Sequence, residues 1–204
     1  FGSKGKSENS AAYLRIQTNF RGADLKVSMI EYARQTLYSF GIETAINKSG
    51  FWFEVADVQG DEDYTLVSLG LDRALSETLF AQIEYHHNGA GTDDPPAYTQ
   101  KINEIAYRKG GVTLFGNDYF LPSISAQISP LLNLSLGAVF NLTDNSSFIS
   151  LLGEWSATEN FYIDLGWYHF SGRDFLELSS GAVTLGSEYG LNSDLVFTTL
   201  KYYF

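Results

Sequence analysis

The stretch Leu195-Val-Phe-Thr-Thr-Leu-Lys-Tyr-Tyr-Phe204, at the end of the sequence, alternates strictly between two kinds of side chain. On one face of an extended strand lie Val196, Thr198, Leu200, Tyr202 and Phe204. The opposite face carries Asp194 and Lys201, so one side suits lipid or an apolar core and the other suits water or protein. This pattern is typical of a strand in a transmembrane β-barrel, although a strand of a soluble β-sandwich also alternates.

The composition agrees with one all-β domain over residues 1–204. The chain is 15% aromatic and contains 19 Gly but only 4 Pro, which indicates many strands and tight turns. No apolar run approaches the roughly 18 residues that a membrane-spanning helix needs, so a helical membrane protein is excluded. The absence of cysteine excludes disulfides and thiolate metal sites and suits an oxidising periplasm. A net charge of -11 argues against nucleic acid as a partner.

The same period of two recurs along the whole chain. Strong segments lie at 38–46, 51–56, 64–72, 79–87, 119–128, 132–141, 148–156 and 161–170, and weaker ones lie at 12–20 and 24–32. Short turns, such as Asn47-Lys-Ser-Gly50, join several neighbouring segments. The sequence therefore predicts an all-β fold: a transmembrane antiparallel up-and-down β-barrel with about 10–12 strands in this chain.

Aromatic side chains provide an independent test of this fold. If Phe204 is periplasmic, the direction of every strand follows, and the outward aromatics fall at two levels. The periplasmic level holds Phe20, Phe51, Trp155, Phe161 and Phe204, and the outer level holds Tyr38, Tyr85, Phe120, Phe140 and Trp167. Two aromatic belts are what a bilayer requires, and a soluble sandwich has no reason to form them.

The strand count of eleven places the start of the first strand on the extracellular side. Bacterial single-chain barrels have an even number of strands. Either an amino-terminal strand is miscounted or the chain is the carboxy-terminal portion of a larger barrel; the second is favoured because residues 1–10 resemble the interior of an extracellular loop. Residues 88–118 and 171–192 are expected to be long extracellular loops. Within the first, residues 98–108 are expected to form a short helix with Ile102, Ile105 and Ala106 on one face.

Inward positions of the expected barrel hold many Ser and Gly residues, which cannot fill a wide lumen. The predicted lumen-lining charged and polar residues are Arg15, Lys26, Glu43, Glu54, Glu84, His86, Glu154, Asp164 and Lys201. An excess of carboxylates favours cations, although the charges are also able to pair with one another across the lumen and only stabilise the wall. The first hypothesis is a channel for small polar solutes with a mild cation preference. No metal or cofactor is expected: of the neighbours Glu84, His86 and His87, only Glu84 and His86 share a face, and two ligands are weak evidence for a metal site.

Through its period and aromatic belts, nearly the whole chain resembles the porin-like outer-membrane barrels of Gram-negative bacteria. The ending with Leu200, Tyr202 and Phe204 resembles the signal read by the barrel-insertion machinery. This resemblance implies a place in the cell outer membrane, contact with membrane lipid and lipopolysaccharide, and assembly by that machinery. It also implies a further partner, either the remaining amino-terminal part of the barrel or a partner subunit.

Two alternative functions stay open. His169 and Ser171 lie at the outer rim, and Glu188 follows in the next loop. This group is similar to the His-x-Ser and later Glu of outer-membrane lipid A deacylases. Gly172 stands where that family has Asn. The similarity implies attack on an acyl ester. The other alternative is a structural barrel that anchors a partner protein through acidic loop residues at 61–63, 93–94 and Asp144. Conductance without a partner distinguishes a channel from an anchor.

Overall fold

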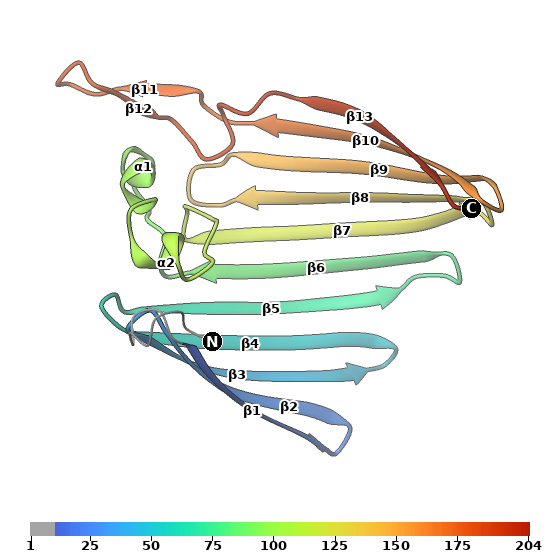
Figure 1. Ribbon diagram of the computed structural model, residues 1–204, viewed down its shortest axis with the longest axis horizontal. Coiled ribbons are helices and arrows are strands. Elements are labelled where there is room, and N and C mark those ends of the chain that lie inside the picture. Colours follow the sequence, from blue (N-terminus) through green and yellow to red (C-terminus); the bar gives the residue numbers. More distant parts are fainter. Residues whose placement is uncertain (1–10) are drawn as a thin grey trace.

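The computed structural model describes residues 11–204 and consists mainly of one antiparallel sheet of eleven strands, which follow one another across the sheet in chain order (Figure 1). The strands are β1 (Ala11–Phe20), β2 (Ala23–Tyr32), β3 (Gln35–Ile46), β4 (Ser49–Gly60), β5 (Tyr64–Ala74), β6 (Leu79–Asn88), β7 (Asp118–Ser129), β8 (Leu132–Asn141), β9 (Ser147–Thr158), β10 (Phe161–Ser171) and β13 (Leu195–Tyr202). The all-β, antiparallel part of the prediction is confirmed. The expected start at residues 1–10 lies outside the described residues.

Each strand pairs with its chain neighbour, and β13 pairs with β10. Because β1 pairs with β2 and β13 with β10, rather than with each other, the sheet is open. The register separates its two faces. One cross-strand row reads Phe53, Leu69, Tyr85, Phe120 and Phe140. The row beside it on the opposite face reads Glu54, Ser68, His86, Tyr119 and Asn141. We call these the apolar face and the polar face.

Connections differ between the two ends of the strands. At one end, which we call the turn edge, short links join β1 to β2, β3 to β4, β5 to β6, β7 to β8 and β9 to β10. The link at Asn47 and Lys48 has φ of 50° and 69°, the two positive values that a type I′ hairpin turn requires. At the opposite end, the loop edge, lie the long connections 89–117 and 172–194. The two expected long loops are therefore present and share one edge.

The loop 89–117 folds back against the loop edge of the sheet. It contains η2 (Pro95–Ala97), α1 (Tyr98–Lys101) and α2 (Ile105–Arg108). A small apolar cluster lies beneath it, with Val58 and Tyr64 from the sheet and Ala90 and Ala106 from the loop. No helix within residues 11–204 is long and apolar enough to cross a membrane.

The expectation of a single helix over 98–108 was wrong. The Glu62 carboxylate, from the link between β4 and β5, accepts the backbone N–H groups of Ile105 at 2.8 Å and Ala106 at 3.0 Å. This contact fixes a new helix start at Ile105 and separates α2 from α1. Ile102 is 52% exposed while Ala106 is fully buried, so these side chains do not share one buried face.

The loop 172–194 contains a two-stranded ribbon that the sequence did not predict. It is formed by β11 (Phe175–Glu177) and β12 (Val183–Leu185), which pair with each other and not with the main sheet. Each strand has only three residues, which is too short to show a recognisable period of two.

Candidate functional site

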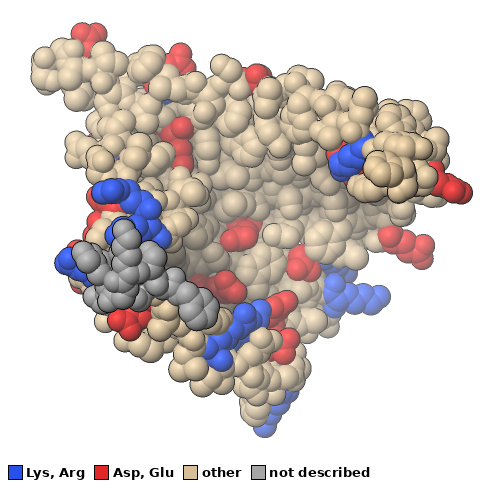
Figure 2. Space-filling view, in the orientation of Figure 1, with Lys and Arg blue, Asp and Glu red and all other residues tan. Residues whose placement is uncertain are grey.

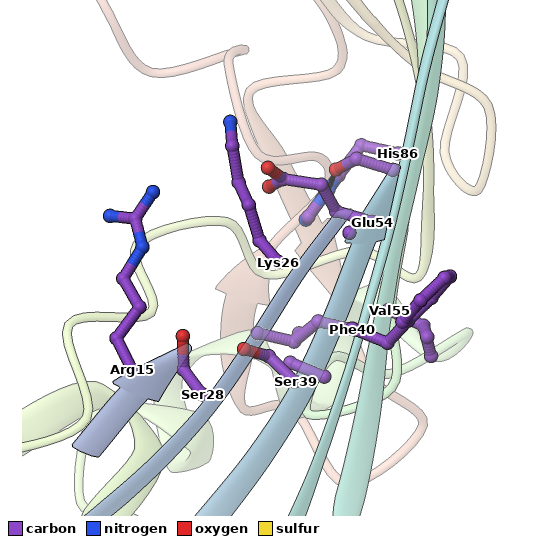
Figure 3. Close-up of a pocket in the computed structure, with 12 residues that line it drawn as sticks. Arg15, Lys26, Ser28, Ser39, Phe40, Glu54, Val55 and His86 are labelled. Carbon is purple, nitrogen blue, oxygen red and sulfur yellow. Dashed lines mark hydrogen bonds between the residues drawn. The ribbon is translucent and has the colours of Figure 1, made fainter. Parts of the chain in front are cut away.

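The polar face is hollowed between β1 and β6. One hollow, of about 430 Å³, is lined in part by Arg15, Lys26, Glu54 and His86. Figure 3 shows Arg15, Lys26 and Glu54 extending from the same side of the strands. A second hollow, of about 440 Å³, is lined by Glu43, Trp52, Glu54, Ser68, Gln82 and Glu84. The two hollows share Glu54 and Ser68, so we treat them as one trough (Figure 2, where acidic side chains lie in the hollowed face).

Small side chains keep the trough open at its centre. Gly41, Ser39 and Ser28 come from adjacent strands and lie beside the longer Lys26 and Glu54. A Cβ placed on Gly41 would lie 3.5 Å from the Glu54 side chain, which is ordinary van der Waals contact. Residues of this size leave room for water and small solutes along the strands.

Some of the expected lumen-lining charges pair with neighbours on the same face. Lys26 Nζ lies 3.0 Å from Glu43 Oε2, and Lys201 Nζ lies 2.6 Å from Asp164 and 3.4 Å from Glu154. These contacts join side chains on nearby strands and not across a lumen. These groups therefore do pair, but between neighbouring strands of the sheet and not across a lumen, as the alternative interpretation expected.

The remaining expected residues are not ion-paired within the described part of the chain. Arg15 donates to Gln17 at 3.0 Å, and His86 Nδ1 lies 2.8 Å from Ser68 Oγ. Glu54 and Glu84 form no ion pair with any residue from 11 to 204. They line the same hollow, which Arg15 does not line, so this part of the trough carries an excess of negative charge within residues 11–204.

At the loop edge, a half-buried carboxylate joins both long loops to the polar face. Glu188, from loop 172–194, accepts the Phe115 backbone N–H at 3.0 Å, the Tyr119 hydroxyl at 2.5 Å and the Asn141 amide at 2.7 Å. The Glu188 backbone N–H donates to Asp144 at 2.7 Å. We call these five residues the Glu188 latch. Tyr119 and Asn141 are almost completely buried, so the latch is screened from water.

Further contacts support the latch. The Thr184 hydroxyl donates to the Pro96 carbonyl at 3.0 Å, which ties β12 to η2. The Phe115 ring stacks against Tyr107 with centroids 5.4 Å apart. Burial raises the pKa of the Glu188 carboxyl above its usual value, although hydrogen bonds from Tyr119, Phe115 and Asn141 oppose this effect. Because Tyr119 and Asn141 belong to the polar face, the joined loops cover the outer end of that face.

Sequence reasoning assigned Glu188 to a rim group with His169 and Ser171, but hydrogen bonds place it elsewhere. His169 Nδ1 lies 2.8 Å from Asp194 Oδ2, and its ring stacks on Trp167 with centroids 5.4 Å apart. The His169 ring therefore packs against Trp167, the preceding residue on the apolar face, and not against Ser171. Within residues 11–204 no hydrogen bond joins His169, Ser171 and Glu188.

The closing strand needs one correction. Asp194 was expected on the same face as Lys201, but it binds His169 of the apolar face and accepts the Phe170 backbone N–H at 3.1 Å. The reason is the period of two itself: positions 194 and 196 lie two apart, so Asp194 shares the apolar face of Val196, whereas Lys201, an odd position, lies on the polar face. Leu200 and Tyr202 pair with Ile163 and Phe161 of the apolar face, as expected, and β13 ends at Tyr202, ahead of Phe204.

No protein-family model matches the chain, and no curated protein shows significant similarity to it.

Proposed function

We propose that the chain forms much of the wall of a porin-like channel for small polar solutes in the outer membrane of a Gram-negative bacterium. The observation that carries the proposal is the contrast between the two faces of the eleven-stranded sheet. Large apolar side chains are exposed on one face across the sheet: Leu14, Ile16, Val27, Leu69, Ile83, Leu136, Leu151, Leu165 and Leu200. In water such a surface favours aggregation, whereas in a bilayer it faces lipid.

The connections support one orientation. Short links on one edge and long loops on the other are the arrangement of outer-membrane barrels, in which the short turns are periplasmic. The loop edge then faces outward, toward lipopolysaccharide. In this orientation the aromatic ending with Leu200, Tyr202 and Phe204 serves as the assembly signal for the insertion machinery.

A bilayer also places a condition on the sheet edges. Lipid cannot form hydrogen bonds with the free backbone N–H and C=O groups at the edges of β1 and β13. A sheet that spans a bilayer must therefore be closed. We infer that further strands pair with both edges in the working assembly, supplied by the remaining part of the barrel or by a partner subunit.

The unpaired carboxylates of the trough support a mild cation preference. In water, a unit charge about 8 Å from a passing ion changes its energy by about 0.5 kcal/mol, or roughly a factor of two in population. Glu54 and Glu84 both line the trough and are not neutralised by an ion pair within residues 11–204. Their joint field is therefore sufficient for a small selectivity and too weak for a strict one.

Selectivity in planar bilayers tests the proposal. The double variant Glu54→Gln and Glu84→Gln is expected to lower the permeability ratio of K⁺ to Cl⁻ by about twofold or more, since two such charges are removed. The control variant, Glu159→Gln with Glu177→Gln, makes the same change of charge away from the trough and should leave the ratio almost unchanged. A membrane-inserted protein that conducts no ions would rule out the channel.

The acidic loop residues do not favour the anchoring alternative, because several act within the chain. Asp61 pairs with Arg34 at 2.9 Å, Glu62 binds the start of α2, and Asp63 accepts the Gly60 backbone N–H at 2.9 Å. Asp144 belongs to the Glu188 latch. These carboxylates shape the loops, and nothing in their geometry singles out a protein partner.

A further inference from the structure

The two hollows of the trough differ in the charges that line them. The hollow of about 440 Å³ is lined by three carboxylates and by no cationic side chain. The hollow of about 430 Å³ is lined by Arg15 and Lys26 as well as by Glu54. Figure 3 shows Arg15 on one side of this second hollow and Glu54 on the other. We call it the mixed-charge hollow.

One cation and one anion of the mixed-charge hollow have no ion-pair partner within residues 11–204. Arg15 donates one N–H to Gln17 at 3.0 Å, which leaves the rest of its five N–H donors available. Glu54 forms no ion pair in the same part of the chain. Lys26 differs, because Glu43 engages its ammonium at 3.0 Å. Arg15 and Glu54 are both exposed, so a solute in the hollow meets one charge of each sign.

Small side chains form the floor between these two charges. The register places Ser28, Ser39 and Ala56 in the cross-strand row of Arg15, and Gly41 beside Glu54 in the next row. All of these residues line the hollow. An extended solute is therefore able to lie across the strands from Arg15 to Glu54 without meeting a bulky side chain in the row of Arg15.

The distance between the two charges indicates how long that solute is. Arg15 on β1 and Glu54 on β4 are three strands apart across the sheet and two residues apart in register. With strands about 4.8 Å apart and residues about 3.4 Å apart along a strand, their Cα atoms are about 16 Å apart. Side chains stand roughly perpendicular to a sheet, so a solute held at both ends by hydrogen bonds of about 3 Å carries charges about 10 Å apart. A peptide extends by at most about 3.5 Å per residue, so about three residues match and a single amino acid is too short.

We propose that the mixed-charge hollow binds zwitterionic short peptides of about three residues. The terminal carboxylate lies on the Arg15 guanidinium, whose planar fork fits a carboxylate, and the terminal ammonium donates to Glu54. Such a peptide has no net charge, so the excess of carboxylates in the neighbouring hollow does not repel it. The inference names a solute class for the proposed channel and rests on that proposed function.

Peptide binding to the full chain in detergent, measured by saturation-transfer NMR, tests the proposal. The probes are trialanine, N-acetyl-trialanine, trialanine amide and the doubly blocked N-acetyl-trialanine amide, at about pH 6.5, where a free amino terminus is protonated. Trialanine should bind about tenfold more tightly than either singly blocked peptide, because each block removes one charge-assisted hydrogen bond.

Two variants assign the ends of the peptide. Arg15→Gln should weaken trialanine binding to the level of trialanine amide and leave the binding of the amide unchanged. Glu54→Gln should do the same with respect to N-acetyl-trialanine. The control variants Arg21→Gln and Glu159→Gln make the same changes of charge in links at the turn edge, away from the hollow. Both should keep the preference for trialanine.

The comparison of the four peptides on the unaltered chain decides the proposal even if a variant folds poorly. No binding of trialanine, equal binding of the four peptides, or tighter binding of the cationic amide than of trialanine would overturn it. Binding in detergent is measured without conductance. A conducting protein that lacks the preference for trialanine would refute the peptide site alone, and a protein that binds trialanine but conducts no ions would refute the channel alone.

Discussion

Among single residues, Glu188 has the most consequential environment, because its half-buried carboxylate in loop 172–194 accepts hydrogen bonds from loop 89–117 and from strands β7 and β8. Burial raises its pKa above the ordinary 4.5. The folded protein therefore binds a proton more readily than the unfolded chain does, and stability falls as pH rises through the window between the two pKa values. The neighbouring titratable groups are Asp144 and the tyrosines Tyr98, Tyr107, Tyr119 and Tyr189. Burial raises the pKa values of the three loop tyrosines, Tyr98, Tyr107 and Tyr189, so they do not titrate in this window.

We therefore expect the latch to be firmer in mild acid than at neutral pH. Hydrogen exchange of loops 89–117 and 172–194, corrected for intrinsic rates, should show protection falling as pH rises from the ordinary carboxyl pKa of 4.5 through the higher pKa of folded Glu188. Glu188→Gln should remove this pH dependence and lower protection throughout, because the Gln amide places a donor where the carboxylate accepts. Asp144→Asn should retain the dependence. Protection that rises with pH, or an unchanged profile in Glu188→Gln, would contradict the assignment.

The same residue shows what a sequence pattern lacks. A period of two assigns Glu54 or Tyr119 to a face, because strand geometry alone decides it. Glu188 lies outside any long strand, and its partner Tyr119 is 69 positions away in the chain. Its membership in a buried cluster depends on how two loops pack together, which no local pattern encodes. For that reason the trough residues were predicted from the sequence, whereas the latch was not.

At the scale of elements, the register of β9 offers a direct test of which face meets lipid. Leu151 lies between Leu136 and Trp167 on the apolar face, and Ser150 lies between Gly137 and Tyr168 on the polar face. Leu151→Arg should destabilise the protein in lipid vesicles by about 2–4 kcal/mol, since the charge enters the hydrocarbon region. Ser150→Arg should cost less than about 1 kcal/mol. Urea titrations of the vesicle-inserted variants provide both values, and a larger loss for Ser150→Arg would mean that the faces are reversed.

Element boundaries were recovered unevenly, and the reason is physical. Strands β8 and β10 agree with the predicted segments to within a residue, since their alternation is strong and turn residues follow directly. For β3 and β4 the predicted segments were too short. They are 12 residues each in the structure, and the polar residues near their ends, such as Gln35 and Gln59, obscure the period. Helices α1 and α2 were merged in the prediction because the separating contact comes from Glu62, a residue distant in sequence.

For the molecule as a whole, the odd number of sheet strands within residues 11–204 restricts how the sheet is completed. Every neighbouring pair among the eleven strands is antiparallel, so β1 and β13 run in the same direction. If β1 and β13 of one chain paired directly, they would form a parallel pair. The same is true if β13 of one copy paired with β1 of a second copy inserted in the same orientation. An all-antiparallel barrel instead needs an odd number of added strands, at least one, between β13 and β1.

Cysteine cross-linking tests this argument cleanly, because the chain has no cysteine of its own. Cysteines that combine Leu14, Ile16 or Thr18 of β1 with Leu200 of β13 should give no cross-link within one chain when the vesicle-inserted protein is treated with a short thiol-specific reagent. The control pair Ile163→Cys with Leu200→Cys should cross-link readily, because these residues are register partners on β10 and β13. Efficient joining of β1 to β13 would mean that the barrel closes with eleven strands and a parallel seam. Cross-links between two copies would instead show that a second copy supplies the neighbouring strand. Either product, within one chain or between copies, would contradict the expectation of an all-antiparallel barrel.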